Sequence, residues 1–223
     1  MKDGNFEEAG FYFPREICIL SNKPIGFICD FSNHCIRMID FRKERVTTIA
    51  GSKERKTGHQ DGRGQNSLFY FPNSIVVNKG QNLLFVSDQY NHVIKQIDIS
   101  ALHQHMFGEM YEDQQKNQKP REGDNDKIEF EFFVSAICGK PKQRGFEDGI
   151  GNEAKLNEPI GMAFSQIDEN ILYFCHSFNY CIRRLNIVTK QVSTVLGFPD
   201  QSEAQFYNPS GICVDKKRKF VSL

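Results

Sequence analysis

The sequence predicts an all-β fold of short strands in tandem units, because several features recur in a fixed order. An Asp-Gly dipeptide is followed about ten residues later by a proline, and after a further 19 or 20 residues by Asn-His or Asn-Tyr. Each copy closes with a β-branched run that ends in glycine. Four-stranded units in tandem are typical of propeller blades, so we predict a partial β-propeller of three complete blades and about half of a fourth. The copies begin at Asp3, Asp61 and Asp148, and the four prolines are Pro14, Pro72, Pro159 and Pro209.

Each complete unit is predicted to form four strands in the same order. The first follows the proline, the second ends before a tight turn, the third contains an Ile-Arg or Ile-Lys step, and the fourth is a Val-x-Thr-Ile type of segment. All four are rich in β-branched and aromatic residues. In the turn 30–33 we expect Asn33 to tolerate a positive φ and Asp30 to accept backbone N–H groups. The strands predicted in the first unit are 17–20, 26–29, 35–40 and 46–50.

The repeats divide the chain into blades. We assign residues 1–60 to blade 1, 61–147 to blade 2, 148–201 to blade 3 and 202–223 to an incomplete blade 4. In register, the last four residues align with the second strand of blade 2. We therefore expect an open arc with an exposed strand edge, and such edges invite pairing. Two interpretations stay open: a fragment of a longer propeller protein, or a chain whose edge recruits a partner or associates with a second copy.

A polar insertion separates the third and fourth strands of blade 2, at about 99–128. Its centre, 112–124, is highly polar and has little apolar surface to bury. Such a composition predicts a mobile loop. It is either a tolerated surface insertion or a segment that docks a partner.

The motifs together resemble NHL repeats. The resemblance lies in the Asp-Gly-x-Gly loops at Asp61 and Asp148, the Pro-x-x-Ile start of the first strand, the Val-Ser-Asp end of the second, and Asn-His-x-Ile-Arg. It covers essentially the whole chain apart from 99–128. The first unit lacks the second glycine of the loop, and the third has His176 and Tyr180 where the others have aspartate and histidine. NHL propellers are binding platforms for protein or RNA, and relatives of similar architecture are lactonases and the peptide-amidating lyase, so the resemblance implies a fold and several possible functions.

The composition of the chain argues against some of these functions and partners. The chain has 28 basic and 28 acidic residues, and this zero net charge argues against a nucleic-acid partner held by the overall field. No apolar run reaches the ~18 residues of a membrane helix, so we expect no membrane association. The seven cysteines are odd in number and include no C-x-x-C pair, which favours a reducing compartment and a cytoplasmic location.

The cysteines and histidines are interpreted mainly as structural. Three pairs of cysteines occupy equivalent repeat positions in different blades, which disfavours disulfides and a shared metal site and favours small buried side chains. His34 and His92 belong to the repeat and are expected to hold the turn or the neighbouring blade. His103 and His105 could bind a metal weakly, but the sequence places no third ligand beside them. We assign no catalytic residue, no cofactor and no metal.

The leading functional prediction is a non-catalytic scaffold that binds a protein partner. Its contact surface is expected on the face of the Asp-Gly loops and Asn-His turns, or on the insertion. The strand-three cations could bind phosphate or an acidic peptide, but the favoured interpretation is that each pairs with an acidic side chain of its own or the next blade. The candidate surface comprises Asp30, Asn33, His34, Asp88, Asn91, His92, His176, Asn179, Tyr180, Arg37, Lys95 and Arg183.

Two alternatives from other classes remain. One is part of an enzymatic, six-bladed type of propeller, lactonase-like or lyase-like, in which Asp30, Asp88 and His176 would converge on a divalent metal. The other is an RNA-binding domain with a basic face. The densest basic run, 216–219, falls in register at a hairpin of blade 4, and a nuclear signal or nucleic-acid patch there is the less favoured interpretation.

Overall fold

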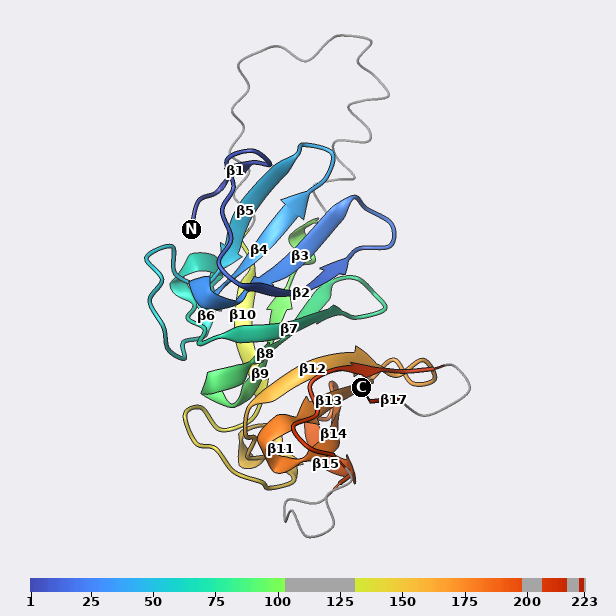
Figure 1. The fold of residues 1–223 in the computed structure, drawn as a ribbon. Coiled ribbons are helices and arrows are strands. Elements are labelled where there is room, and N and C mark those ends of the chain that lie inside the picture. The colour runs from blue at the N-terminus through green and yellow to red at the C-terminus, as the bar shows by residue number, and fades with distance from the viewer. Residues whose placement is uncertain (103–130, 198–205, 216–220, 223) are drawn as a thin grey trace.

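The computed structural model describes residues 1–102, 131–197, 206–215 and 221–222, and in these ranges it is built from antiparallel sheets. Three five-stranded sheets and one two-stranded sheet follow one another along the molecule, from blade 1 at the top of Figure 1 to blade 3 at the bottom. The all-β, partial-propeller architecture predicted from the repeats is confirmed.

The three large sheets share one strand order. Blade 1 has the order β1-β5-β4-β3-β2, and blades 2 and 3 repeat it as β6-β10-β9-β8-β7 and β11-β15-β14-β13-β12. Blade 1 contains β1 (Gly4–Asn5), β2 (Pro14–Ile19), β3 (Ile25–Asp30), β4 (Cys35–Asp40) and β5 (Arg45–Ala50). Blade 2 contains β6 (Gly62–Arg63), β7 (Pro72–Val77), β8 (Leu83–Asp88), β9 (Val93–Asp98) and β10 (Phe133–Cys138). Blade 3 contains β11 (Gly149–Ile150), β12 (Pro159–Phe164), β13 (Ile171–His176), β14 (Cys181–Asn186) and β15 (Gln191–Leu196), and β16 (Ile212–Cys213) pairs with β17 (Val221–Ser222).

The Asp-Gly segments differ from the prediction, because they form a fifth strand rather than a loop. Gly4 pairs with Val46, and Gly62 and Gly149 make the equivalent pairs with the fourth strands of their own blades. The fourth strand would otherwise present a row of unpaired backbone groups, and the short extra strand satisfies part of that edge. Val46 lies near the start of β5, at the end of the sheet away from the tight turn 31–33. The Asp-Gly segments therefore lie along the fourth strand and not over the tight turns.

The apolar core lies between neighbouring blades rather than inside one sheet. Phe27 and Ile36 of blade 1 pack in one buried cluster with Ile75, Leu84 and Val86 of blade 2. A second cluster joins blades 2 and 3 in the same way. Strand alternation explains this arrangement, because successive side chains point to opposite faces, one toward the preceding blade and one toward the following blade. Burial of each such side chain contributes roughly 1.5–3 kcal/mol.

Several sequence features lie outside the described residues. These are positions 103–128 of the predicted insertion, with His103 and His105, and the basic run 216–219. Among the helices of the described ranges, none has the length and apolar character needed to cross a membrane.

Candidate functional site

Three short 3-10 turns define one face of the arc. They are η1 (Phe31–Asn33), η3 (Gln89–Asn91) and η5 (Ser177–Asn179), each joining strand two to strand three, and they appear as coils on the left of Figure 1. The residue after each turn takes the left-handed conformation, with φ of 57° at His34, 58° at His92 and 53° at Tyr180. The prediction that Asn33 would carry the positive φ was wrong, because the asparagine ends the 3-10 turn and the next residue reverses the chain. We call this surface the turn face.

The residue before each turn anchors the chain that approaches the repeat proline. The Asp30 carboxylate accepts the Tyr12 N–H at 2.8 Å, and Asp88 accepts the Tyr70 N–H at 2.7 Å. In blade 3, Nε2 of His176 accepts the equivalent N–H, that of Asn157. The histidine therefore replaces the carboxylate as a hydrogen-bond acceptor at this repeat position, which explains the departure noted in the sequence.

The strand-three cations bind the Asp-Gly segment of their own blade. Arg37 reaches Asp30 at 2.7 Å and Asp3 at 2.9 Å, and it also donates to the carbonyls of Lys2 and Gly10. All of its charged partners lie in blade 1. The guanidinium thus fastens the outer segment of the blade to its centre.

The same cation position is filled in the other two blades. Arg183 donates to the carbonyls of Glu147 and Lys155 and pairs with Asp148 at 2.6 Å. Lys95 donates to two equivalent carbonyls and lies 3.3 Å from Asp61. Of the two pairings left open by the sequence, with the cation's own blade or with the next, the geometry shows the first.

Most of the predicted interaction surface is buried, which corrects the sequence analysis. A side chain that lies at a turn need not be exposed. Here the polar atoms of these side chains form hydrogen bonds with the backbone and side chains of their own or a neighbouring blade. Asn91, for example, donates to the Gly58 carbonyl at 2.6 Å and to Asp88 at 2.7 Å. His92 and Tyr180 are half-buried. The ten buried residues are Asp30, Asn33, His34, Arg37, Asp88, Asn91, Lys95, His176, Asn179 and Arg183.

The two repeat histidines connect neighbouring blades. Nδ1 of His34 accepts the Phe71 N–H, and Nδ1 of His92 accepts the Glu158 N–H, each at 3.2 Å. Burial lowers the pKa of both rings, which favours the neutral form that can accept a hydrogen bond. Phe71 and Glu158 precede the repeat prolines and have positive φ values of 57° and 51°, a conformation that is costly for such residues. The histidine of the preceding blade helps to hold it.

Of the two strand-three cations whose blade has an aspartate before the turn, Lys95 makes the more distant contact with that aspartate. Its ammonium lies 4.0 Å from Asp88, whereas the Arg37 guanidinium approaches Asp30 to 2.7 Å. Burial raises the pKa of the Asp88 carboxyl to about 7 from an ordinary value of 3.8. Between these two pH values the folded chain binds a proton that the unfolded chain has released, so this group lowers stability as pH rises from about 4 to about 7.

We expect the substitution Lys95→Arg to stabilise the protein at pH 8 by about 1–2 kcal/mol, because a charge-assisted hydrogen bond replaces a distant contact. The gain should shrink as the pH falls below about 7, because Asp88 beside Lys95 then takes up a proton and the missing close cation costs less. Urea unfolding at a series of pH values measures this difference. Lys79→Arg, at an exposed site, is the control, and a Lys95→Arg effect that does not change with pH would contradict the assignment.

Exposed aromatic side chains on the turn face were missed in the sequence analysis. Tyr12 and Phe13 are 50% and 64% exposed, and Tyr90 is 40% exposed. The signal was present in the sequence, because an aromatic pair precedes the proline in blades 1 and 2. We name the following set the aromatic turn cluster: Tyr12, Phe13, Phe31, Tyr70, Phe71 and Tyr90.

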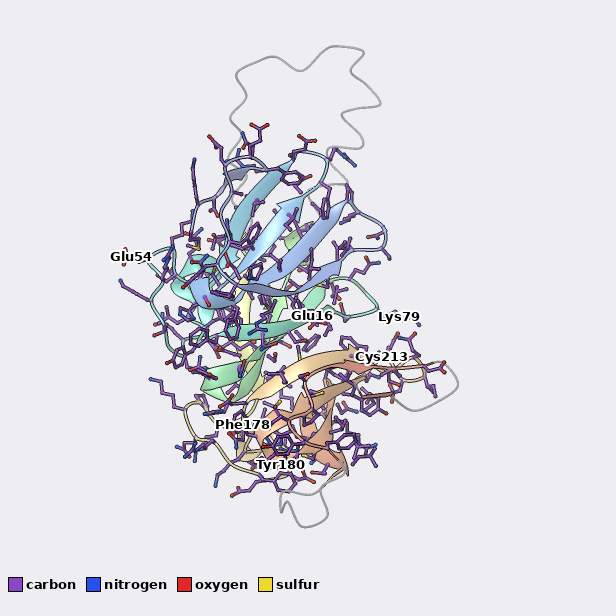
Figure 2. All side chains as sticks on the ribbon, viewed as in Figure 1. Glu16, Glu54, Lys79, Phe178, Tyr180 and Cys213 are labelled. Atoms are coloured by element: carbon purple, nitrogen blue, oxygen red, sulfur yellow. The ribbon has the colours of Figure 1, made fainter. Side chains whose placement is uncertain are left out.

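Ring contacts hold the aromatic turn cluster across two blades. The ring centroids of Phe31 in blade 1 and Phe71 in blade 2 are 4.6 Å apart. Those of Tyr90 and Phe71 are 5.0 Å apart, with the two rings in an edge-on contact. The guanidinium of Arg15 sits over the Phe31 ring at 4.8 Å. Aromatic rings continue on the same face into blade 3, where Figure 2 labels Phe178 and Tyr180.

Exposed arginines border this cluster. Arg15 is exposed on β2. After burial, the positive charges of the exposed Arg55 and Arg144 further lower the pKa of His34 and His92 respectively. The turn face therefore combines aromatic rings with positive charge.

All seven cysteines are free thiols, and five of them are buried. Burial raises the pKa of Cys138, Cys175 and Cys181 to about 12, so these thiols stay protonated and unreactive at neutral pH. Cys213, labelled in Figure 2, is exposed and departs from the expectation of small buried side chains.

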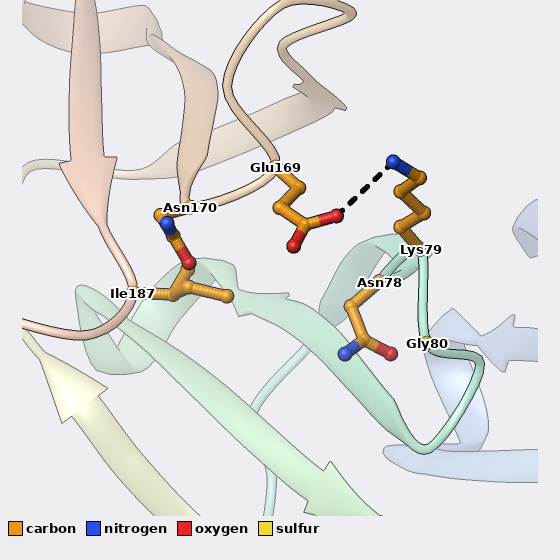
Figure 3. A pocket seen from close by; sticks show the side chains of 6 residues that line it. All are labelled: Asn78, Lys79, Gly80, Glu169, Asn170 and Ile187. Carbon is orange, nitrogen blue, oxygen red and sulfur yellow. Dashed lines mark ion pairs between the residues drawn. The ribbon is translucent and has the colours of Figure 1, made fainter.

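The described residues offer little that resembles a catalytic or metal centre. No group of three or more His, Cys, Asp or Glu side chains in these ranges could hold a metal ion. Asp30, Asp88 and His176, the ligands expected for an enzymatic propeller, each bond to the backbone of their own blade. A shallow hollow of about 300 Å³ lies between two hairpins, where Lys79 and Glu169 pair at 3.3 Å (Figure 3). Both charges are largely exposed to solvent, as expected for a surface ion pair.

Comparison with known proteins places the repeats in a family. No protein-family model matches the chain. Human NHL repeat-containing protein 2 is 25% identical over 282 residues, an alignment that covers 99% of this chain and 38% of that protein. The chain is similar to NHL-repeat proteins along nearly its whole length. The resemblance to the NHL-repeat β-propeller family inferred from the motifs is thereby confirmed.

Other similarities to this NHL-repeat chain agree. SUPPRESSOR OF QUENCHING 1, chloroplastic, of Arabidopsis thaliana is 25% identical over 264 residues, which cover 99% of this chain and 25% of that protein. An auxiliary nutrient binding protein from Bacteroides thetaiotaomicron has a TM-score of 0.59 and 19% identity over 89% of this chain and 42% of its own. The NHL-repeat chain thus spans 25% to 38% of these two curated relatives.

Proposed function

We propose that this NHL-repeat chain is a non-catalytic scaffold that binds an acidic segment of a protein partner on its turn face. The aromatic turn cluster carries the proposal, because it is partly exposed although it joins two blades. Aromatic residues and arginine are enriched in the energetic centres of protein interfaces. The bordering arginines Arg15, Arg55 and Arg144 add a positive charge that complements an acidic segment.

The non-catalytic part of the proposal rests on the hydrogen bonds of the side chains that could otherwise act in catalysis or bind a metal. Asp88 and His176 would be the reactive or metal-binding groups of an enzymatic propeller, yet both accept hydrogen bonds from their own blades. Their side chains are fully buried. A cytoplasmic, reducing location is part of the same proposal and is supported by the seven unpaired thiols.

The test is selection of peptides from a random-sequence phage library with the purified chain. Acidic peptides should be enriched, and the substitutions Tyr90→Ala and Arg15→Glu should each weaken their binding about tenfold or more, which corresponds to ~1.4 kcal/mol. Both side chains are exposed, so the fold should tolerate these changes. Ile167→Ala and Arg42→Glu are matched controls at exposed positions outside the cluster.

Two outcomes would contradict the proposal. One is enrichment of peptides without acidic residues, or of peptides whose binding is unchanged in both variants. The other is tight binding of a single-stranded RNA oligonucleotide that Tyr90→Ala abolishes, because aromatic and arginine side chains also stack on bases. That result would assign the turn face to nucleic acid.

A further inference from the structure

Two equivalent contacts on the turn face differ in their chemistry. In each, the first residue of a turn meets the residue before the repeat proline of the next blade, and we call such a contact a blade junction. At the junction of blades 1 and 2, the ring of Phe31 packs against the ring of Phe71. At the junction of blades 2 and 3, the side-chain amide of Gln89 donates to the Glu158 carboxylate at 2.8 Å. An amide and a carboxylate thus replace an aromatic pair at the same repeat positions.

The residue after each repeat proline extends this contrast. In blade 1 this residue is Arg15, whose guanidinium lies over the ring of Phe31. In blade 2 it is Asn73, whose side-chain amide donates to the side-chain oxygen of Gln89 at 2.8 Å. The hydrogen bonds of the second junction therefore run in one direction and end on the carboxylate. The two junctions carry opposite charges, a guanidinium at the first and a carboxylate at the second.

The Glu158 carboxylate has no cationic partner within the described ranges, where no residue forms an ion pair with it. The side chain is half-buried, and a partly desolvated charge is stabilised when an opposite charge joins it. The backbone that carries it is held in place, because the His92 ring accepts the Glu158 N–H. The exposed Arg144 lowers the pKa of His92 through its positive charge, yet it too forms no ion pair with another described residue.

The surroundings of this carboxylate suit a cationic side chain. An ionised carboxylate has about four acceptor positions, and the Gln89 amide uses one of them. Tyr90 follows Gln89 directly in η3 and is 40% exposed, so an aromatic ring is available next to the junction. Carboxylates form strong charge-assisted hydrogen bonds with ammonium and guanidinium groups, and aromatic rings attract the same cations.

We propose that the acidic partner segment also carries one lysine or arginine, whose side chain pairs with Glu158 at the junction of blades 2 and 3. This inference rests on the proposed scaffold function and adds the direction in which the segment lies across the blades. Acidic side chains of the segment face Arg15 at the junction of blades 1 and 2, and the basic side chain faces the next junction. A segment in the opposite direction would place like charges together, which disfavours that orientation.

The experiment repeats the peptide selection with the unchanged chain and with Glu158→Lys. Peptides that bind the unchanged chain should carry a lysine or arginine at a fixed spacing from their acidic residues. Peptides that bind Glu158→Lys should carry an aspartate or glutamate at that position instead. Glu158→Gln keeps an oxygen that can accept from Gln89, and it should select neither charge there. Glu44→Lys, at an exposed site on the β4–β5 hairpin, is the control and should leave the selected sequences unchanged.

A charge exchange then measures the pairing directly, by fluorescence-polarisation titration of one selected peptide. Glu158→Lys alone, or glutamate in place of the basic residue of the peptide alone, should weaken binding at least about tenfold, because like charges then face each other. The two changes together should restore most of the lost affinity. Circular dichroism of each variant checks that it is folded.

The outcomes separate this inference from the function on which it rests. Acidic peptides that depend on Arg15 but have no basic position would overturn the pairing with Glu158 and leave the proposed function standing. A basic position that Glu158→Lys does not change would do the same. Failure to select acidic peptides at all would overturn both.

Discussion

Replacement of Arg37 by alanine is expected to lower the free energy of unfolding by about 3–5 kcal/mol. The guanidinium is fully buried and bonds to two carboxylates and two backbone carbonyls. Its removal leaves the buried Asp30 carboxylate without a cation, and the desolvation of that charge is no longer compensated. The Lys2 and Gly10 carbonyls also lose their donor. Urea unfolding followed by circular dichroism measures the change.

Two further variants separate the ion pair from general effects of losing an arginine. Arg42→Ala removes an exposed guanidinium of the same blade and should change stability by no more than about 0.5 kcal/mol. Arg37→Lys reproduces the arrangement of blade 2 and should recover part of the loss, which keeps the measurement possible if Arg37→Ala does not fold. An Arg37→Ala cost below about 1 kcal/mol would show that the network contributes little.

The second large effect is expected at Gly51, where alanine should destabilise the protein by about 3 kcal/mol. Gly51 has a φ of 92°, and an added Cβ would lie 2.6 Å from the His34 carbonyl oxygen and 2.8 Å from the Cys35 Cα. The neighbouring atoms are backbone and cannot rotate away. Backbone strain of this kind costs of order 1–3 kcal/mol before the clash is added. Thermal unfolding should show a clear fall in Tm.

Gly211→Ala is the matched control for this substitution. A Cβ at Gly211 meets nothing within 4 Å, and its φ is not in the left-handed region. We expect stability there to change by less than about 1 kcal/mol. Equal effects at Gly51 and Gly211 would contradict the role of the His34 contact.

Local pattern was sufficient to predict the blades but not the burial of their polar residues. Strand order follows from alternation and turn residues, which act over a few positions. The burial of Arg37 depends on contacts with Asp3 and Lys2, more than thirty residues earlier in the chain. The fifth strand depends on a pairing of similar range between Gly4 and Val46. Neither contact has a signature within one strand, so repeat positions that were assigned to a surface proved to be internal.

The sequence also did not show how a residue that departs from the repeat pattern is used, or which aromatic residues are exposed. His176 looked like the loss of an aspartate, yet its ring nitrogen accepts the same backbone N–H. The aromatic pairs before the prolines were visible as residues, but their exposure depends on how two blades meet, as Phe31 and Phe71 do. Most of the residues assigned to the candidate face are therefore buried, while its exposed aromatic residues were not predicted.

The pairing of the Asp-Gly strand with the fourth strand makes each repeat close upon itself. The first and last strands of one repeat lie side by side, as Gly62 and Val134 do, so none of the three five-stranded sheets borrows a strand from the next repeat. The strand pairing of each of these sheets can be completed as soon as its own residues have been synthesised, before the following repeat exists. Gain or loss of one repeat during evolution would then alter the size of the arc without leaving any other sheet incomplete.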